Sequence, residues 1–172
     1  MVTMYTTFQS SIYSYLGLQK DASSLTDLAY QSQRIAKVVR GATSIESVAA
    51  NDIVFYAYFA PTDAYVSKVH YYLSADSKQL FVDITPMTAN PPVGTLDTSK
   101  SRTYKIIDNF RQTSGLSLFN YMNAGGSAMT LPISDFNSIK GVKINLATAN
   151  AYNQSNQMMS VQVSLRNRKT NL

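Results

Sequence analysis

Cysteine is absent from this chain, and histidine and glutamate occur once each, as His70 and Glu46. Without cysteine, the chain forms no disulfide and offers neither a thiolate metal ligand nor a cysteine nucleophile. A serine triad would have to use His70, which strand alternation places on the same solvated face as Lys68. No two carboxylates stand at motif spacing, and Asp76 and Asp83 flank a predicted strand as turn residues. We therefore expect no enzyme, no cofactor and no metal site.

Charged residues are also scarce, at 15% of 172 residues, whereas 45% are hydrophobic. This composition is typical of an ordered globular protein with a weakly charged surface. No apolar run approaches the ~18 residues needed to cross a bilayer. Gly125-Gly126 lies outside any phosphate-binding motif, so we expect a tight turn there. The length suits one domain, which we expect to cover residues 1–172.

The first 41 residues predict one long amphipathic helix, over residues 4–40, which ends before Gly41. Apolar residues recur three and four positions apart along it, as on one face of a helix. This stripe allows two interpretations, which can hold for different halves: the core face of a helix packed on a sheet, or an assembly helix that continues beyond the domain. We expect the second half to pack on the chain's own sheet, through Leu25, Leu28, Ile35 and Val39. We expect the first half to contact partner helices, through Tyr5, Phe8, Ile12 and Tyr15.

Residues 42–172 predict a β-rich part. β-Branched and aromatic runs indicate strands over residues 52–59, 65–73, 79–85, 102–108, 116–122, 140–147 and 158–166. The first three are joined by short turns and predict an antiparallel meander. Residues 86–101 predict a surface loop, 133–139 a short helix or turn capped by Ser134, and 148–157 a hairpin loop. The expected fold class is α+β, with one long N-terminal helix packed on an antiparallel sheet of about six or seven strands.

The net charge of +5 comes mainly from two local clusters, in residues 100–111 and in the C-terminal tail. If the strands that carry them are adjacent, the clusters form one basic patch that could contact DNA, with a tyrosine as a stacking group. The residues of this predicted patch are Lys100, Arg102, Tyr104, Lys105, Arg166, Arg168 and Lys169.

Several segments resemble, in the same order, the W-type minor pilins and J-type minor pseudopilins, which are prepilin-like proteins of type IV pili and type II secretion systems. The helix end at residues 31–40 is followed by an Asn-x-Ile/Val-x-Phe strand at 51–55 and by Ile-Asp-Asn-Phe at 107–110. The Phe-Asn-Tyr strand at 119–121 leads to Gly125, and residues 139–146 and 161–167 resemble the closing strands. Family members begin with a basic leader, a prepilin peptidase site and an apolar helix of about 20 residues, none of which is in this chain.

The resemblance implies a pilin-like fold and a non-enzymatic structural subunit that helps to initiate or cap a type IV pilus-like filament. It implies that the helix starting at Tyr5 is the distal half of a longer one, and that a preceding segment anchors the full-length protein in the membrane. The expected partners are other minor and major pilins, contacted through the N-terminal helix. The expected location is the inner or cytoplasmic membrane before assembly and the cell surface afterwards. The alternative is a DNA- or surface-ligand-binding module at a pilus tip that uses the basic patch.

Overall fold

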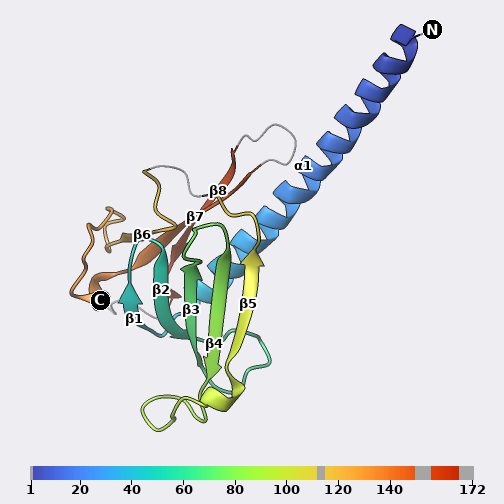
Figure 1. Cartoon of the computed structure of the whole chain (residues 1–172). Coiled ribbons are helices and arrows are strands. Elements are labelled where there is room, and N and C mark those ends of the chain that lie inside the picture. Colours follow the sequence, from blue (N-terminus) through green and yellow to red (C-terminus); the bar gives the residue numbers. More distant parts are fainter. Residues whose placement is uncertain (1, 112–114, 150–155, 167–172) are drawn as a thin grey trace.

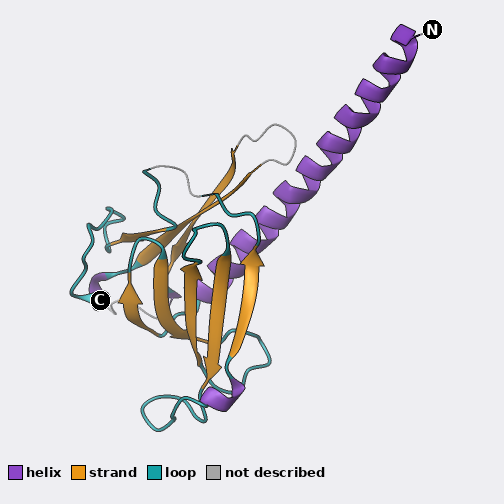
Figure 2. Cartoon of the chain, viewed as in Figure 1, coloured by secondary structure: helices purple, strands orange, loops and turns teal. Residues whose placement is uncertain are grey.

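A long helix leads into a β-rich part built from two separate antiparallel sheets (Figures 1 and 2). The computed structural model describes residues 2–111, 115–149 and 156–166, with side chains described for all of these except residues 2–18, 20, 21 and 149. The elements are α1 (Val2–Arg40), β1 (Ser44–Val48), β2 (Asp52–Ala57), β3 (Ser67–Leu73), β4 (Leu80–Pro86), η1 (Thr98–Lys100), β5 (Arg102–Ile107), β6 (Phe119–Met122), η2 (Phe136–Ser138), β7 (Gly141–Ala149) and β8 (Asn156–Ser164).

The strands divide into a five-stranded sheet, in the order β1-β2-β3-β4-β5, and a three-stranded sheet, in the order β6-β7-β8. The predicted meander is confirmed, because β2, β3 and β4 pair antiparallel in sequence order. The predicted fold class is wrong. The described residues contain eight strands in two sheets, so the chain is mostly β, not one helix packed on a single sheet of six or seven strands. Alternation within a strand shows which face is buried, but not which strands belong to the same sheet.

One face of the C-terminal half of α1 is buried between the two sheets. Leu28, Ile35 and Val39 are each 1% exposed and belong to one core cluster with residues of both sheets. On one side of the helix the Ser32 hydroxyl donates to the sulfur of Met159 in β8, at 3.2 Å. On the other side, Arg34 lies over the ring of Phe59, which follows β2. The N-terminal half of α1 extends away from both sheets (Figure 1).

A short segment between β1 and β2 ties the two sheets together. The Phe119 amide donates to the Ala50 carbonyl at 2.9 Å. The Tyr121 hydroxyl, on a side chain that is 1% exposed, donates to the backbone carbonyls of Ala49 at 2.8 Å and Asp52 at 3.2 Å. β6 thus supplies hydrogen-bond donors to backbone carbonyls at the start of β2 and just before it, which joins the two sheets.

Some local predictions also need correction. β1 lies before the first predicted strand, where the sequence analysis predicts none, and η2 is a single 3₁₀ turn capped by the Asp135 side chain, not by Ser134. Asp83 lies within β4 rather than in a turn. Asp76 does lie in a turn, where its carboxylate accepts from the Ser74 hydroxyl at 2.5 Å and the Lys78 amide at 3.1 Å. The tight turn at Gly126 is confirmed by its φ of 77°.

Candidate interaction surfaces

The first candidate surface is the projecting half of α1. The backbone of this half is helical throughout, but the side chains of Tyr5, Phe8, Ile12 and Tyr15 lie outside the described residues. Figure 1 shows that this part of the helix lies beyond the ends of the strands. Leu25, which the sequence predicts in the core, is 43% exposed, because the helix enters the space between the sheets only after this residue.

The predicted basic patch is divided between the two sheets. Arg102, Tyr104 and Lys105 lie on β5, and Lys100 precedes it in η1. Arg166 follows β8, in the other sheet, so it is not on a strand adjacent to β5. Arg168 and Lys169 lie outside the described residues. The structure therefore brings four of the seven predicted residues together and separates a fifth from them.

Two of the three basic residues around β5 already form ion pairs with carboxylates of this chain. Lys100 pairs with Asp97 at 3.0 Å, and Lys105 pairs with Asp108 at 2.8 Å. The hydrogen bond from Lys105 is the main reason why the pKa of the Asp108 carboxyl group is lowered. Arg102 forms no ion pair with any described residue, so it is the cation of this group left to meet a partner's anion.

Two aromatic rings and a second arginine lie on the same face of the five-stranded sheet as Arg102. Tyr104 is opposite Val82 and Arg102 is opposite Ile84, so both project from the inner face, the one that packs toward α1. The rings of Tyr104 and Phe59 are nearly parallel, with centroids 6.4 Å apart. The guanidinium group of Arg34 lies 5.3 Å from the centroid of Phe59. Tyr104 is 41% exposed because β5 is at the edge of the sheet.

The opposite, outer face of this sheet carries a polar and aromatic network centred on His70. The His70 Nε2 atom lies 2.6 Å from the Asp52 carboxylate on β2, and its Nδ1 atom lies 4.0 Å from the Asp83 carboxylate on β4. Asp83 also accepts a hydrogen bond from the Thr103 hydroxyl, at 2.6 Å. The ring of Tyr72 stacks on His70, with centroids 4.6 Å apart. Burial, followed by the negative charge of Asp83, raises the pKa of the Tyr72 hydroxyl group.

Sequence reasoning correctly placed His70 beside Lys68 on a solvated face, but it missed the two carboxylates that converge on His70. The pairing of Asp83 with His70, and of Val54 with His70, follows from the register of the meander. The short predicted turns could have given that register. Within the described residues, the hydroxyl group of Thr103 donates to Asp83, and no serine or threonine hydroxyl group bonds to His70.

At the β1 side of the outer face, Lys68 donates to the only glutamate. This hydrogen bond is the main reason why the pKa of Glu46 is lowered from its usual value of 4.5. Burial, and then the hydrogen bond with Glu46, raises the pKa of Tyr56. On the outer face, Lys68 therefore pairs with Glu46, and His70 lies between Asp52 and Asp83.

The described residues contain no group of three or more histidine, aspartate or glutamate side chains that could hold a metal ion. Within the same residues, no helix combines the length and the hydropathy that a membrane crossing requires. No family model matches this chain, and no curated protein matches it either.

Proposed function

We propose that this protein is a non-enzymatic structural subunit, a minor pilin or pseudopilin, that helps to initiate or cap a type IV pilus-like filament. The observation that carries the proposal is the division of α1 into a half packed between the sheets and a half that extends away from them (Figure 1). A helix of 39 residues is about 58 Å long, so the projecting part is long enough to reach well into a neighbouring bundle of helices.

The composition of the projecting half supports a role in assembly. Residues 2–17 are rich in threonine, serine and tyrosine and include Gly17, all of which are weaker helix formers than alanine or leucine. A helix of such residues is marginal in water on its own, and most helical stability comes from packing of an apolar face. The stripe of Tyr5, Phe8, Ile12 and Tyr15 would supply that face to partner helices. In this proposal the partners are sister pilins, and a preceding segment anchors the subunit in the inner or cytoplasmic membrane until it enters a filament at the cell surface.

The order of segments that resemble the W-type and J-type proteins supports the specific choice of filament. The satisfied charge network around His70 supports a non-enzymatic role, because its carboxylates and hydroxyl groups are bonded to one another. We do not propose DNA capture by one basic patch. Arg166 is on the other sheet, and Lys100 and Lys105 already pair with carboxylates.

Site-specific photocrosslinking tests the proposal. A photoreactive phenylalanine analogue at Tyr5, Phe8, Ile12 or Tyr15, in the complete gene expressed in its own cells, should form adducts with sister subunits. The matched control is Tyr30, also on α1 and 62% exposed, which should form few such adducts because it lies beside the chain's own sheets. Deleting the gene should reduce the number of filaments per cell. The proposal fails if the four N-terminal positions form no adduct with any filament protein and filament numbers do not change.

The coding sequence upstream of residue 1 gives an independent test. The proposal expects an apolar segment of about 20 residues preceded by a peptidase site. A soluble domain or a stop codon in that place would contradict it.

A further inference from the structure

The edges of the two sheets differ in how well they are covered. β1 is short, contains a bulge between Ile45 and Ser47, and has η2 packed against it. The outer edge of β6 is bonded by the backbone of neighbouring segments, since the Phe119 amide donates to Ala50 and the Tyr121 carbonyl accepts from Met129. α1 packs across β8 and its neighbour β7. Bulges, short length and covering segments are the ways in which proteins protect sheet edges.

Within the described residues no segment covers the outer side of β5, although its ladder with β4 shifts register between Lys105 and Ile107. Within the described part of the chain, its backbone hydrogen bonds are those with β4, and no turn or loop bonds its other side. Figure 1 shows β5 as the outermost strand of its sheet. The first four of its six residues are exposed, from Arg102 to Lys105. A partner strand could therefore reach the free amides and carbonyls of β5 directly.

We infer that β5 is a docking edge, to which an extended, acidic segment of a partner protein adds as a sixth strand of the five-stranded sheet. In strand addition, backbone hydrogen bonds provide affinity and alternate side chains provide specificity. The inference deepens the proposed function and rests on it only for the identity of the partner, which would be another protein of the filament.

Charge selects the class of partner. Arg102, on β5, and Arg34, which lies over the ring of Phe59, form no ion pair with a described residue. Alternate residues of an added strand would meet these arginines on the inner face, and carboxylates there would form charge-assisted hydrogen bonds. A second copy of this chain is a poor occupant, because its net charge is +5 and it has only ten acidic residues, spread singly along 172 positions.

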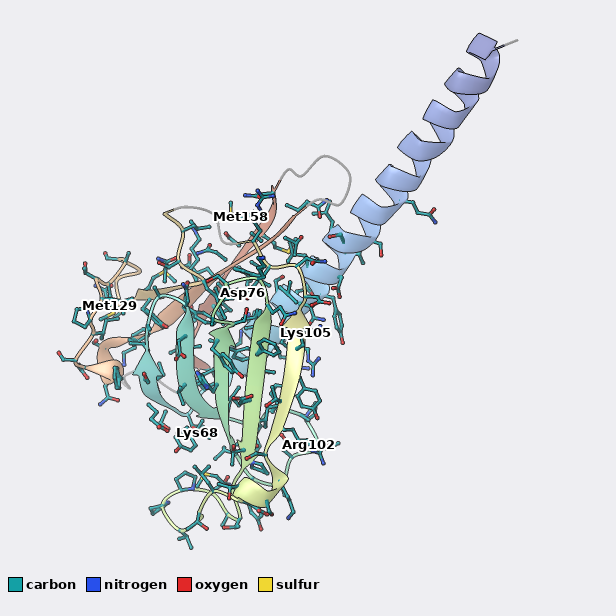
Figure 3. All side chains as sticks on the ribbon, viewed as in Figure 1. Lys68, Asp76, Arg102, Lys105, Met129 and Met158 are labelled. Atoms are coloured by element: carbon teal, nitrogen blue, oxygen red, sulfur yellow. The ribbon has the colours of Figure 1, made fainter. Side chains whose placement is uncertain are left out.

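The rings of Phe59 and Tyr104 indicate which kind of side chain an added strand would carry between its acidic residues. Phe59 and Tyr104 present nearly parallel rings on the same face, next to Arg102 on the strand. An apolar or aromatic side chain of the added strand would pack on the exposed part of Tyr104. Figure 3 shows Arg102 and Lys105 toward opposite ends of β5; Lys105 already pairs with Asp108, so Arg102 is the basic group on β5 that an added strand would meet.

The test uses the whole chain and a labelled probe peptide of about ten residues in which glutamate and valine alternate around one central tyrosine. Fluorescence anisotropy should show saturable binding, and hydrogen exchange should slow at the amides of Arg102–Ile107. Arg102→Glu should weaken binding about tenfold or more, because it replaces a charge-assisted hydrogen bond by a repulsion. The matched control is Lys143→Glu, the same change of charge at an exposed position on the other sheet, which should change affinity less than about twofold.

Two further probes separate this inference from its rivals. The same peptide with N-methyl groups on alternate residues keeps its charge but cannot complete the backbone ladder, and it should not bind. Equal binding of both peptides would overturn strand addition. A single-stranded oligothymidine that binds in place of the peptide, with a steep dependence on salt, would make β5 a nucleic-acid surface and overturn the inference. If neither probe binds, the exposed charges on β5 serve only to keep the edge from pairing, and the inference is wrong.

These outcomes are independent of the crosslinking experiment on α1. Adducts from the projecting helix without peptide binding at β5 would leave the proposed function standing and remove only the docking edge. Peptide binding at β5, with no adducts from the projecting helix and no loss of filaments, would support the docking edge and contradict the proposed function.

Discussion

Replacing Ile35 by alanine removes a side chain that is 1% exposed, at the point where α1 lies between the two sheets. An isoleucine-to-alanine change at a fully buried site costs about 2–5 kcal/mol, from lost transfer energy and the cavity left behind. For a chain of this length, 1 kcal/mol corresponds to roughly 2–4 °C in Tm. We therefore expect Ile35→Ala to lower the Tm by about 9 °C, within a range of roughly 4–20 °C.

Ile12→Ala is the matched control, since it is the same substitution in the same helix, in the half that extends away from the sheets (Figure 1). Thermal unfolding followed by circular dichroism and calorimetry should give the Ile12→Ala chain a Tm within about 2 °C of the parent, because a site without tertiary packing contributes only helix propensity, which favours alanine. If Ile12→Ala lowers the Tm as much as Ile35→Ala, the N-terminal half of α1 is part of the folded core. The proposed division of the helix would then be refuted.

Four further substitutions, at three places in the structure, test particular contacts. Tyr121→Phe deletes the hydroxyl group that serves two backbone carbonyls between the sheets, and should lower the urea-derived free energy of unfolding by about 1–3 kcal/mol. Glu46→Gln should reduce the loss of stability in acid: the pKa of Glu46 is lowered in the folded chain, so its contribution is present above its unfolded pKa and is lost as the pH falls through the folded pKa. This is measured as the difference in Tm between the two chains from pH 6 downward, and Lys68→Gln should flatten the curve in the same way. Gly94→Ala should disturb the loop after β4, because a Cβ atom there would lie 1.8 Å from the Ala89 carbonyl oxygen, and a lower Tm with faster hydrogen exchange in this loop would record it.

Each of these substitutions has a control. Tyr30→Phe removes a hydroxyl group from a side chain that is 62% exposed and should leave the free energy of unfolding unchanged; an equal loss would mean that the buried position of Tyr121 does not matter. Gly125→Ala introduces the same methyl group where the nearest atom is 3.5 Å away, and should be tolerated. For the ion pair, unchanged acid sensitivity in Glu46→Gln would show that the other carboxylates set the acid response.

Local features of this chain followed from local chemistry. The helix end was predictable because three basic residues, Arg34, Lys37 and Arg40, lie in the last turns and Gly41 follows them. α1 does end at Arg40. The core residues Leu28, Ile35 and Val39 followed from helical spacing. The strands of the meander followed from β-branched and aromatic runs separated by turn residues, and their pairing followed from the short turns.

Long-range features did not follow. The chain leaves the five-stranded sheet after Ile107 and begins a new sheet at Phe119, but the alternation of residues is the same in both sheets. The segment Ser44–Val48 was not recognised as a strand, because its sequence Ser-Ile-Glu-Ser-Val is polar, as suits a short edge. The arrangement of Asp52, His70 and Asp83 required the register of three strands, which residue types alone do not give.

The connection between α1 and β1 determines how the protein would carry a mechanical load. After Arg40 the chain turns within two residues, with the Gly41 amide bonded to Val38 and the Thr43 amide bonded to Tyr56 of β2. A tensile force applied along the projecting helix would therefore enter the sheet through β1, and would be resisted by the buried face of α1 and by the hydrogen bonds between β1 and β2. β5 is at the opposite edge of the same sheet. A tensile force on the helix would thus load the hydrogen bonds between β1 and β2, whereas a strand added at β5 would be held by bonds at the opposite edge. A subunit under tension could therefore stay bound to a partner at β5.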